Sequence, residues 1–190
     1  MNFNDIKIMV DAAVKQGACK NEISKIRKLR SFTRVKNHPQ APYWVFWYAS
    51  NVLNDRFPEL EHIVGRHDVF LSWYIEELVK EPCKAIEEMA LQWPISSFRY
   101  AKCVMKDKWP EAEQVILNDT SIIFEYSFHI LNARWLEGEE KILKSDDALT
   151  AYRYARFIIK GRWPEAEDLI LQSSYSDDYN NFLKSLIKVE

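Results

Sequence analysis

Cysteine and glycine are scarce in this chain of 190 residues, and each scarcity excludes a class of protein. The three cysteines, Cys19, Cys83 and Cys103, form no CxxC pair, so neither a disulfide framework nor a zinc site is indicated. Only four glycines accompany 47% hydrophobic residues, which argues against a disordered chain. We expect a packed protein in a reducing compartment.

Long apolar segments are also missing. The most apolar run, residues 41–49, contains Pro42 and is far shorter than the roughly 20 residues that cross a bilayer. The first eleven residues carry charges and lack the apolar core of a signal peptide. The sequence therefore predicts no membrane partner and a cytoplasmic location.

Catalytic signatures are absent as well. The chain has no GxGxxG, Walker A, HExxH, GxSxG or EF-hand pattern. His62 and His67 are five residues apart and do not share a helix face, and His129 lies in an apolar stretch typical of a packed histidine. We expect no enzymatic activity, no metal and no cofactor.

A tandem repeat is what the chain does contain. Two slots recur in five segments, with steps of 26, 26, 26 and 28 residues between copies. The tyrosine slot holds Tyr48, Tyr74, Tyr100, Tyr126 and Tyr154. The glutamate slot, thirteen residues later, holds Glu61, Glu87, Glu113, Glu139 and Glu167. Such a period is typical of stacked supersecondary units, which mainly present surfaces.

Each copy reads as two short helices. In the third copy Tyr100, Val104 and Met105 form an apolar stripe at helical spacing, and the equivalent helix of the fifth copy should close at Gly161 in the left-handed conformation. A second helix should begin at the proline that follows an aromatic residue, because proline suits the first helical position. That aromatic slot holds Phe57, Trp109, Trp135 and Trp163, with Cys83 in the second copy.

The expected fold is therefore all-α: a right-handed solenoid of about five helical hairpins of 26–28 residues, with a helical cap at each end. Two amphipathic stripes predict two leading helices within a basic N-terminal cap, residues 1–42. Residues 43–190 should form the repeat array and its C-terminal capping helix. We expect the whole chain to be one structural domain.

The recurring tyrosines and glutamates admit two interpretations. In the favoured one, each tyrosine ring is buried between copies and its hydroxyl finds an acceptor, which the glutamate can supply. In the other, the glutamates form a ladder of carboxylates that grips a basic partner. Burial of the glutamates decides between them.

Charge is distributed unevenly along the chain. Residues 1–36 contain nine Lys or Arg and three acids, although the net charge of the chain is −2. The basic segment consists of Lys20, Lys25, Arg27, Lys28, Arg30, Arg34 and Lys36. It is either a solvated helix face or a contact for nucleic acid or another partner, and nucleic-acid binding through it should be non-specific because aromatic residues are few.

One copy of the repeat carries a resemblance. Residues 154–167, YARFIIKGRWPEAE, resemble a tandem motif, YAxxVIKGRWPEAE, of uncharacterised proteins from tailed bacteriophages. The likeness extends over residues 46–171, strongly in three copies and weakly in two. It implies a phage or prophage source and the cytoplasm of an infected bacterium, and it transfers no site residue.

The function we expect is that of a protein-interaction module, a phage effector that binds or inhibits a host protein such as a defence component. One alternative is a nucleic-acid binder or mimic, through the basic segment or the acidic repeats. Another is a nucleotide-sequestering protein with a basic pocket between copies, for which the repeats offer Arg99, Lys102, Arg153 and Arg156.

Overall fold

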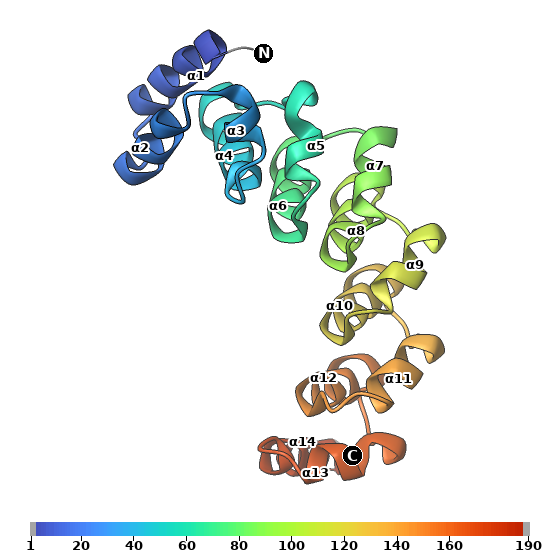
Figure 1. Cartoon of the computed structure of the whole chain (residues 1–190). Helices are drawn as coiled ribbons and strands as arrows, with labels where there is room; N and C mark the ends of the chain where they lie inside the picture. The colour runs from blue at the N-terminus through green and yellow to red at the C-terminus, as the bar shows by residue number, and fades with distance from the viewer. Residues whose placement is uncertain (1–2, 188–190) are drawn as a thin grey trace. The chain divides into compact units, whose positions relative to one another are not determined.

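The computed structural model describes residues 3–187, and all regular secondary structure in that range is helical, which confirms the all-α fold (Figure 1). It contains fourteen α-helices, and no strand occurs among the described residues. The chain divides by its internal contacts into two compact units, Met1–Val104 and Met105–Glu190. This division falls inside the third copy of the repeat and not between residues 42 and 43, so the single domain and the right-handed solenoid stay predictions.

The first unit begins with three helices where the sequence predicted two. They are α1 (Phe3–Lys15), α2 (Lys20–Leu29) and α3 (Phe32–Lys36). The extra break occurs at Arg30, which takes the left-handed conformation with φ of 52° and ends α2. Ile6, Val10, Ala13 and Ile23 form the buried core of this cap.

Helical hairpins follow in both units (Figure 1). The first unit continues with α4 (Ala41–Tyr48), α5 (Glu61–Val64), α6 (Asp68–Leu78), α7 (Lys84–Ala90) and α8 (Pro94–Tyr100). The second contains α9 (Pro110–Ile116), α10 (Thr120–Tyr126), α11 (Leu136–Leu143), α12 (Ala148–Tyr154), α13 (Glu167–Leu171) and α14 (Ser176–Ile187). Within a unit the first helices of successive copies pack together, as α4, α6 and α8 do.

A helical turn begins at the proline that follows the aromatic slot in each copy that has one there, as the sequence predicted. Helix α9 begins at Pro110, and short 3₁₀ turns that begin at Pro58 and Pro164 lead into α5 and α13. Proline loses no hydrogen bond at this position, because the first helical N–H has no partner inside the helix. In the second copy α7 begins at Lys84 instead.

In four of the five copies the tyrosine is followed by a π-helical turn, which the sequence did not predict. Four such turns span Ala49–Leu53, Ala101–Met105, Ser127–Leu131 and Ala155–Ile159. The second copy differs, since α6 continues past Tyr74 to Leu78. A π turn is wider than an α turn and shifts the phase of the side chains. Met105 is consequently exposed and not part of the buried stripe, a correction to the helical spacing assumed for it.

The residue that closes these turns is also different from the predicted one. Lys160 is left-handed, with φ of 57°, whereas Gly161 is not. Lys106, Asn54 and Asn132 take the same conformation at the equivalent position of their copies. The left-handed residue that closes the turn is thus the sixth residue after the slot tyrosine. The glycine that the sequence predicted for this role, Gly161, is the seventh.

Gly138 lies inside α11, where glycine is usually unfavourable, and has a packing role. A Cβ atom there would lie 2.5 Å from Cγ2 of Ile123 and 3.1 Å from Cε3 of Trp135. The equivalent residues of the neighbouring copies in the second unit, Ala112 and Ala166, are fully buried alanines. Glycine thus allows α10 and α11 to approach closely.

Candidate interaction surfaces

The tyrosine slot joins one copy to the next. Each buried hydroxyl accepts a hydrogen bond from the backbone N–H of the aromatic slot in the preceding copy, with N···O distances of 2.6–3.0 Å. The pairs are Phe57 with Tyr74, Cys83 with Tyr100, Trp109 with Tyr126, Trp135 with Tyr154, and Trp163 with Tyr179. Helix α14 therefore carries a sixth slot tyrosine, which the alignment of copies missed because the spacing from Trp163 is shorter.

The same hydroxyls donate to the slot glutamates. The O···O distances are 2.9 Å from Tyr74 to Glu61, 2.8 Å from Tyr100 to Glu87, 3.2 Å from Tyr126 to Glu113 and 3.3 Å from Tyr179 to Glu167. Burial raises the pKa of Tyr100 and of Tyr126 to about 12, since desolvation disfavours the phenolate. The hydroxyl thus keeps the proton that it donates.

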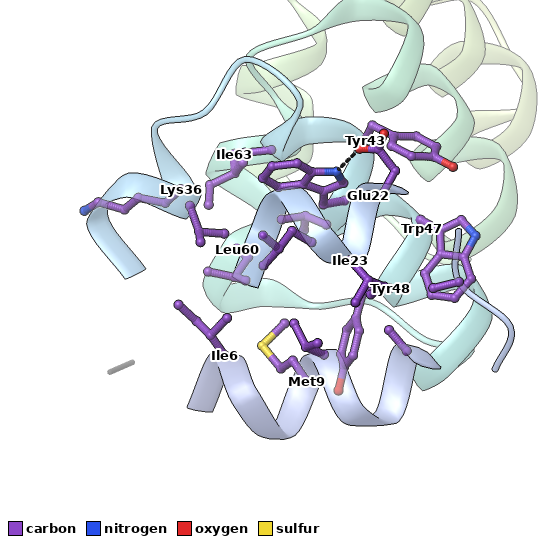
Figure 2. A pocket seen from close by; sticks show the side chains of 18 of the residues that line it. Ile6, Met9, Glu22, Ile23, Lys36, Tyr43, Trp47, Tyr48, Leu60 and Ile63 are labelled. Carbon is purple, nitrogen blue, oxygen red and sulfur yellow. Dashed lines mark hydrogen bonds between the residues drawn. The ribbon is translucent and has the colours of Figure 1, made fainter. Parts of the chain in front are cut away.

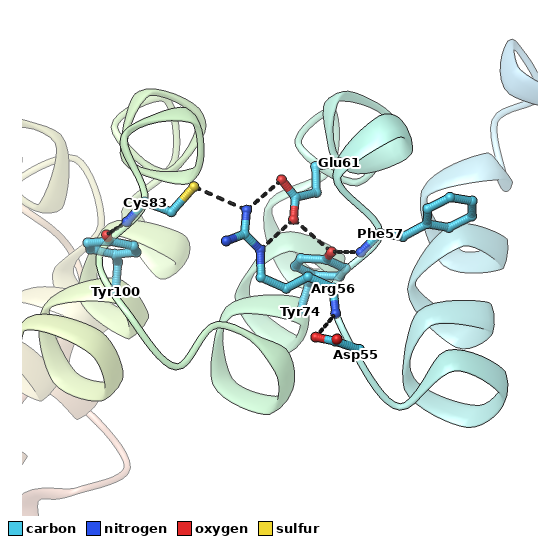
Figure 3. A network of polar contacts seen from close by, with 7 residues as sticks. All are labelled: Asp55, Arg56, Phe57, Glu61, Tyr74, Cys83 and Tyr100. Carbon is cyan, nitrogen blue, oxygen red and sulfur yellow. Dashed lines mark hydrogen bonds and ion pairs between the residues drawn. The ribbon is translucent and has the colours of Figure 1, made fainter.

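Arginine completes the contact in three copies. In the first of them, shown in Figure 3, the guanidinium of Arg56 binds both carboxylate oxygens of Glu61, at 2.7 and 2.9 Å, and donates to Sγ of Cys83 at 3.1 Å. Arg134 forms the same two-bond contact with Glu139, and Arg162 forms it with Glu167. In the sequence, an arginine directly before the Phe or Trp of the aromatic slot in three of the five copies marks this contact.

These contacts favour the packing interpretation of the glutamates. Glu61 and Glu139 are only 4% and 5% exposed, and their oxygens are occupied by arginine. A bidentate arginine fork is a strong, directional contact. Glu61 and Glu139 are therefore internal. The other slot glutamates, Glu87, Glu113 and Glu167, are partly buried and accept hydrogen bonds from slot tyrosines, which argues against a ladder open to a basic partner.

The basic segment lies on α2 and α3 and is mostly exposed. Lys25 pairs with Glu22 at 2.7 Å, and Arg27 lies 3.5 Å from Asp11. The structure brings four of the seven cations to one groove between the end of α1 and α2, namely Lys20, Arg27, Lys28 and Arg30. Lys36 instead borders a cavity on the other side of α2, and Arg34 and Lys25 line neither of the two hollows.

That cavity is apolar and has a volume of about 90 Å³ (Figure 2). Its walls come from α1, α2, α3, α4 and α5, and include Ile6, Ile23, Phe32, Trp44 and Leu60. Glu22 is the one acid in the wall: its carboxylate accepts hydrogen bonds from Lys25 and from Nε1 of Trp44, both at 2.7 Å. These two bonds hold the pKa of Glu22 below its usual value.

The second unit presents exposed aromatic rings beside arginines. Phe128 and Phe157 are 42% and 41% exposed, and each packs against the buried ring of Phe124. The guanidinium of Arg153 stacks 4.1 Å from the Phe124 centroid and binds Glu125 at 2.9 Å, and that of Arg156 lies 5.2 Å from the Phe157 centroid. We call Phe124, Phe128, Arg153, Arg156 and Phe157 the aromatic–arginine surface.

A comparable aromatic cluster occurs in the first unit. Trp73 is 42% exposed and contacts Phe46 and Phe70, with ring centroids 5.7 and 5.6 Å apart. Phe46 lies on α4 and Trp73 on α6, whereas Phe128 and Phe157 lie in the π turns that follow α10 and α12. The sequence did not predict which of these rings are exposed.

The four residues considered for a nucleotide pocket do not converge within either unit. Arg99 pairs with Glu76 at 3.3 Å, and Lys102 lies 5.5 Å from the Phe98 centroid, both in the first unit. Arg153 and Arg156 belong to the aromatic–arginine surface of the second. In each unit the two cationic side chains contact neighbouring aromatic rings or carboxylates of the same unit.

Two further searches were limited to the described residues, 3–187. Within them no three His, Cys, Asp or Glu side chains are grouped to hold a metal ion. No helix in that range is both long enough and apolar enough to span a membrane. Cys19, Cys83 and Cys103 are free thiols.

No known protein family matches this chain, and no curated protein or solved structure is significantly similar to it. The repeat and the surfaces described above are therefore the basis for a functional proposal.

Proposed function

We propose that this protein is a non-enzymatic module that binds another protein through the aromatic–arginine surface of its second unit. The observation that carries the proposal is the pair of exposed phenylalanines, Phe128 and Phe157, held edge to face with ring centroids 6.3 Å apart. Large exposed apolar groups are costly in water unless a partner covers them. Aromatic side chains and arginine are also the residues most enriched at the centre of protein interfaces.

The rigidity of the surface supports the proposal. Phe124, which both exposed rings contact, is 3% exposed, and Arg153 is held by its ring and by Glu125. Side chains that are already ordered lose little conformational entropy on binding. These residues thus offer a preorganised contact area.

We further propose that the partner is a bacterial protein and that the module acts in the host cytoplasm, with a defence component as the expected target. This part rests on the resemblance of the repeat to proteins of tailed bacteriophages. Binding to such a target would serve to block it.

An affinity pull-down from bacterial lysate tests the function. The tagged protein and a double variant, Phe128→Ser with Phe157→Ser, are compared with and without nuclease, and recovered proteins are identified by mass spectrometry. Leu136→Ser is the matched control, because Leu136 is 69% exposed in the same unit but lies on α11, a second helix of the repeat. Circular dichroism establishes that each variant is folded.

We expect one bacterial protein in stoichiometric amount with the wild type and with Leu136→Ser, and its loss with the double variant. Recovery that disappears after nuclease treatment would overturn the proposal in favour of nucleic-acid binding. Equal recovery by the double variant would also overturn it.

A further inference from the structure

The groove and the cavity of the N-terminal cap adjoin each other. Both are lined by Ala18 and Cys19, which form the turn between α1 and α2, and by Ile23 of α2. The two hollows therefore lie on either side of one short stretch of chain, entirely within the first unit. A single extended ligand can reach both.

The groove carries positive charge that the protein itself hardly neutralises. Lys20, Arg27, Lys28 and Arg30 line it, and no acidic side chain is among the described residues of its wall. Arg27 has a carboxylate partner in Asp11, but the atoms are 3.5 Å apart and both side chains are more than half exposed. An exposed pair of this kind contributes little. The groove is complementary to a chain of negative charges.

The cavity is complementary to an apolar group. Of its polar neighbours, the carboxylate of Glu22 is already occupied by Lys25 and Trp44 and offers nothing to a ligand. Phe32, Val35 and Trp47 line the cavity and are only partly buried, so it is reachable from solvent. With about 90 Å³, it is smaller than the roughly 150 Å³ cavity that admits benzene. One aliphatic side chain fits such a space, whereas the acyl chain of a lipid does not.

We propose that the cap binds an acidic segment of another protein, which lays its carboxylates along the groove and inserts one leucine-like side chain into the cavity. Nucleic acid would satisfy the groove alone, since no aromatic residue is among the described residues that line it to stack on bases. The site shares no residue with the aromatic–arginine surface, so its test is independent of the test of the proposed function.

Fluorescence anisotropy with three labelled probes tests the inference on the full-length protein. The first probe is a ten-residue peptide of aspartate and glutamate with one central leucine. The second has alanine in place of that leucine, and the third is an oligothymidine of ten nucleotides. Each is titrated at low and at high salt.

Four variants accompany the probes. Lys28→Glu reverses one charge of the groove, and Lys84→Glu is its matched control, an exposed lysine of the same unit on α7. Ala18→Leu fills the cavity, and Val35→Phe does the same from α3 should the first variant unfold.

The leucine peptide should bind at least tenfold more tightly than the alanine peptide, because its extra methylene and methyl groups leave water. Ala18→Leu or Val35→Phe should abolish that difference, and Lys28→Glu but not Lys84→Glu should weaken both peptides severalfold. High salt should weaken binding of both peptides as well.

Three results would overturn the inference. The first is equal affinity for the two peptides, since the cavity would then hold no anchor. The second is tighter binding of oligothymidine than of the leucine peptide, insensitive to filling of the cavity. The third is no binding of any peptide at low salt.

Discussion

At the residue scale, the buried slot tyrosine links its copy to the preceding one through two hydrogen bonds of a single hydroxyl. In the second unit Tyr126 accepts from the N–H of Trp109 at 2.9 Å and donates to Glu113 at 3.2 Å, with its ring fully buried. Both contacts are made to the preceding copy. Loss of one oxygen atom would therefore leave two groups with reduced hydrogen bonding.

We expect Tyr126→Phe to lower the free energy of unfolding by about 1–3 kcal/mol, because the buried N–H of Trp109 loses its acceptor. Chemical denaturation checks the value. Tyr48→Phe is the control: Tyr48 has no preceding repeat copy, and no hydrogen bond of its hydroxyl to a described residue was found, so its loss should cost less than about 0.5 kcal/mol. Similar losses in the two variants would contradict the prediction.

Alkaline pH should destabilise the fold through the same tyrosines. Their ordinary pKa is about 10, and burial raises that of Tyr100 and Tyr126 to about 12. The folded state therefore holds these protons more tightly than the unfolded state. Their contribution is intact below pH 10 and is lost as the pH rises from about 10 to 12.

Thermal unfolding followed by circular dichroism should show a steep fall in the melting temperature over that window. A fraction of the tyrosinate absorbance, that of buried slot tyrosines such as Tyr100 and Tyr126, should appear only as the protein unfolds. Tyr126→Phe should reduce the slope. Ionisation of all nine tyrosines near pH 10 in a protein that stays folded would refute the assignment.

At the scale of the element, π turns follow the first helices of four copies and end in a left-handed residue. Lys160 takes a left-handed conformation that costs a residue with a Cβ roughly 1–2 kcal/mol. We expect Lys160→Gly to raise the free energy of unfolding by about 0.5–1 kcal/mol, the remainder being offset by the greater flexibility of unfolded glycine. Denaturant titration measures the difference.

Gly161→Ala provides the control for that prediction. Gly161 lacks a positive φ, and an added Cβ would meet only the Ile159 carbonyl oxygen, at 3.9 Å. We expect no loss of stability. Marked destabilisation by Gly161→Ala would show that the left-handed residue is glycine, as the sequence had suggested.

How far the sequence predicts this structure differs between elements. The starts of α9 and of the 3₁₀ turn that leads into α13 follow from Pro110 and Pro164, because proline acts through local geometry. The π turns begin at a small, fully buried residue after the tyrosine, such as Ala101 or Ser127, and no local propensity marks such a turn. The basic segment was identifiable from composition, but its division between a groove and a cavity depends on the packing of α1 against α2.

At the scale of the whole molecule, we expect each copy and its contacts with adjacent copies to contribute separately to the free energy of unfolding. Each copy contacts its neighbours through the tyrosine slot, and in arrays of this kind nearest-neighbour contacts carry most of the stability. Tyr179 of α14 closes the array by accepting from Trp163 at 3.0 Å and donating to Glu167.

A chain truncated after Gln172 lacks α14 and should lose order locally. We expect hydrogen exchange to show lost protection of the Trp163 amide and of α13, with α6 in the first unit unchanged. The intact chain measured in parallel is the reference. Equal loss of protection in α6 would mean that the protein unfolds as one cooperative body.

The placement of each buried slot tyrosine's hydrogen-bond partners in the preceding copy also bears on how such a chain evolves. No copy is complete alone, yet any copy can satisfy the next one, because the tyrosine, the glutamate and the aromatic slot recur in the same order. An in-frame duplication or deletion of one whole period would leave each hydroxyl with both of its partners. The number of copies can thus change by recombination within a gene without the loss of these hydrogen bonds.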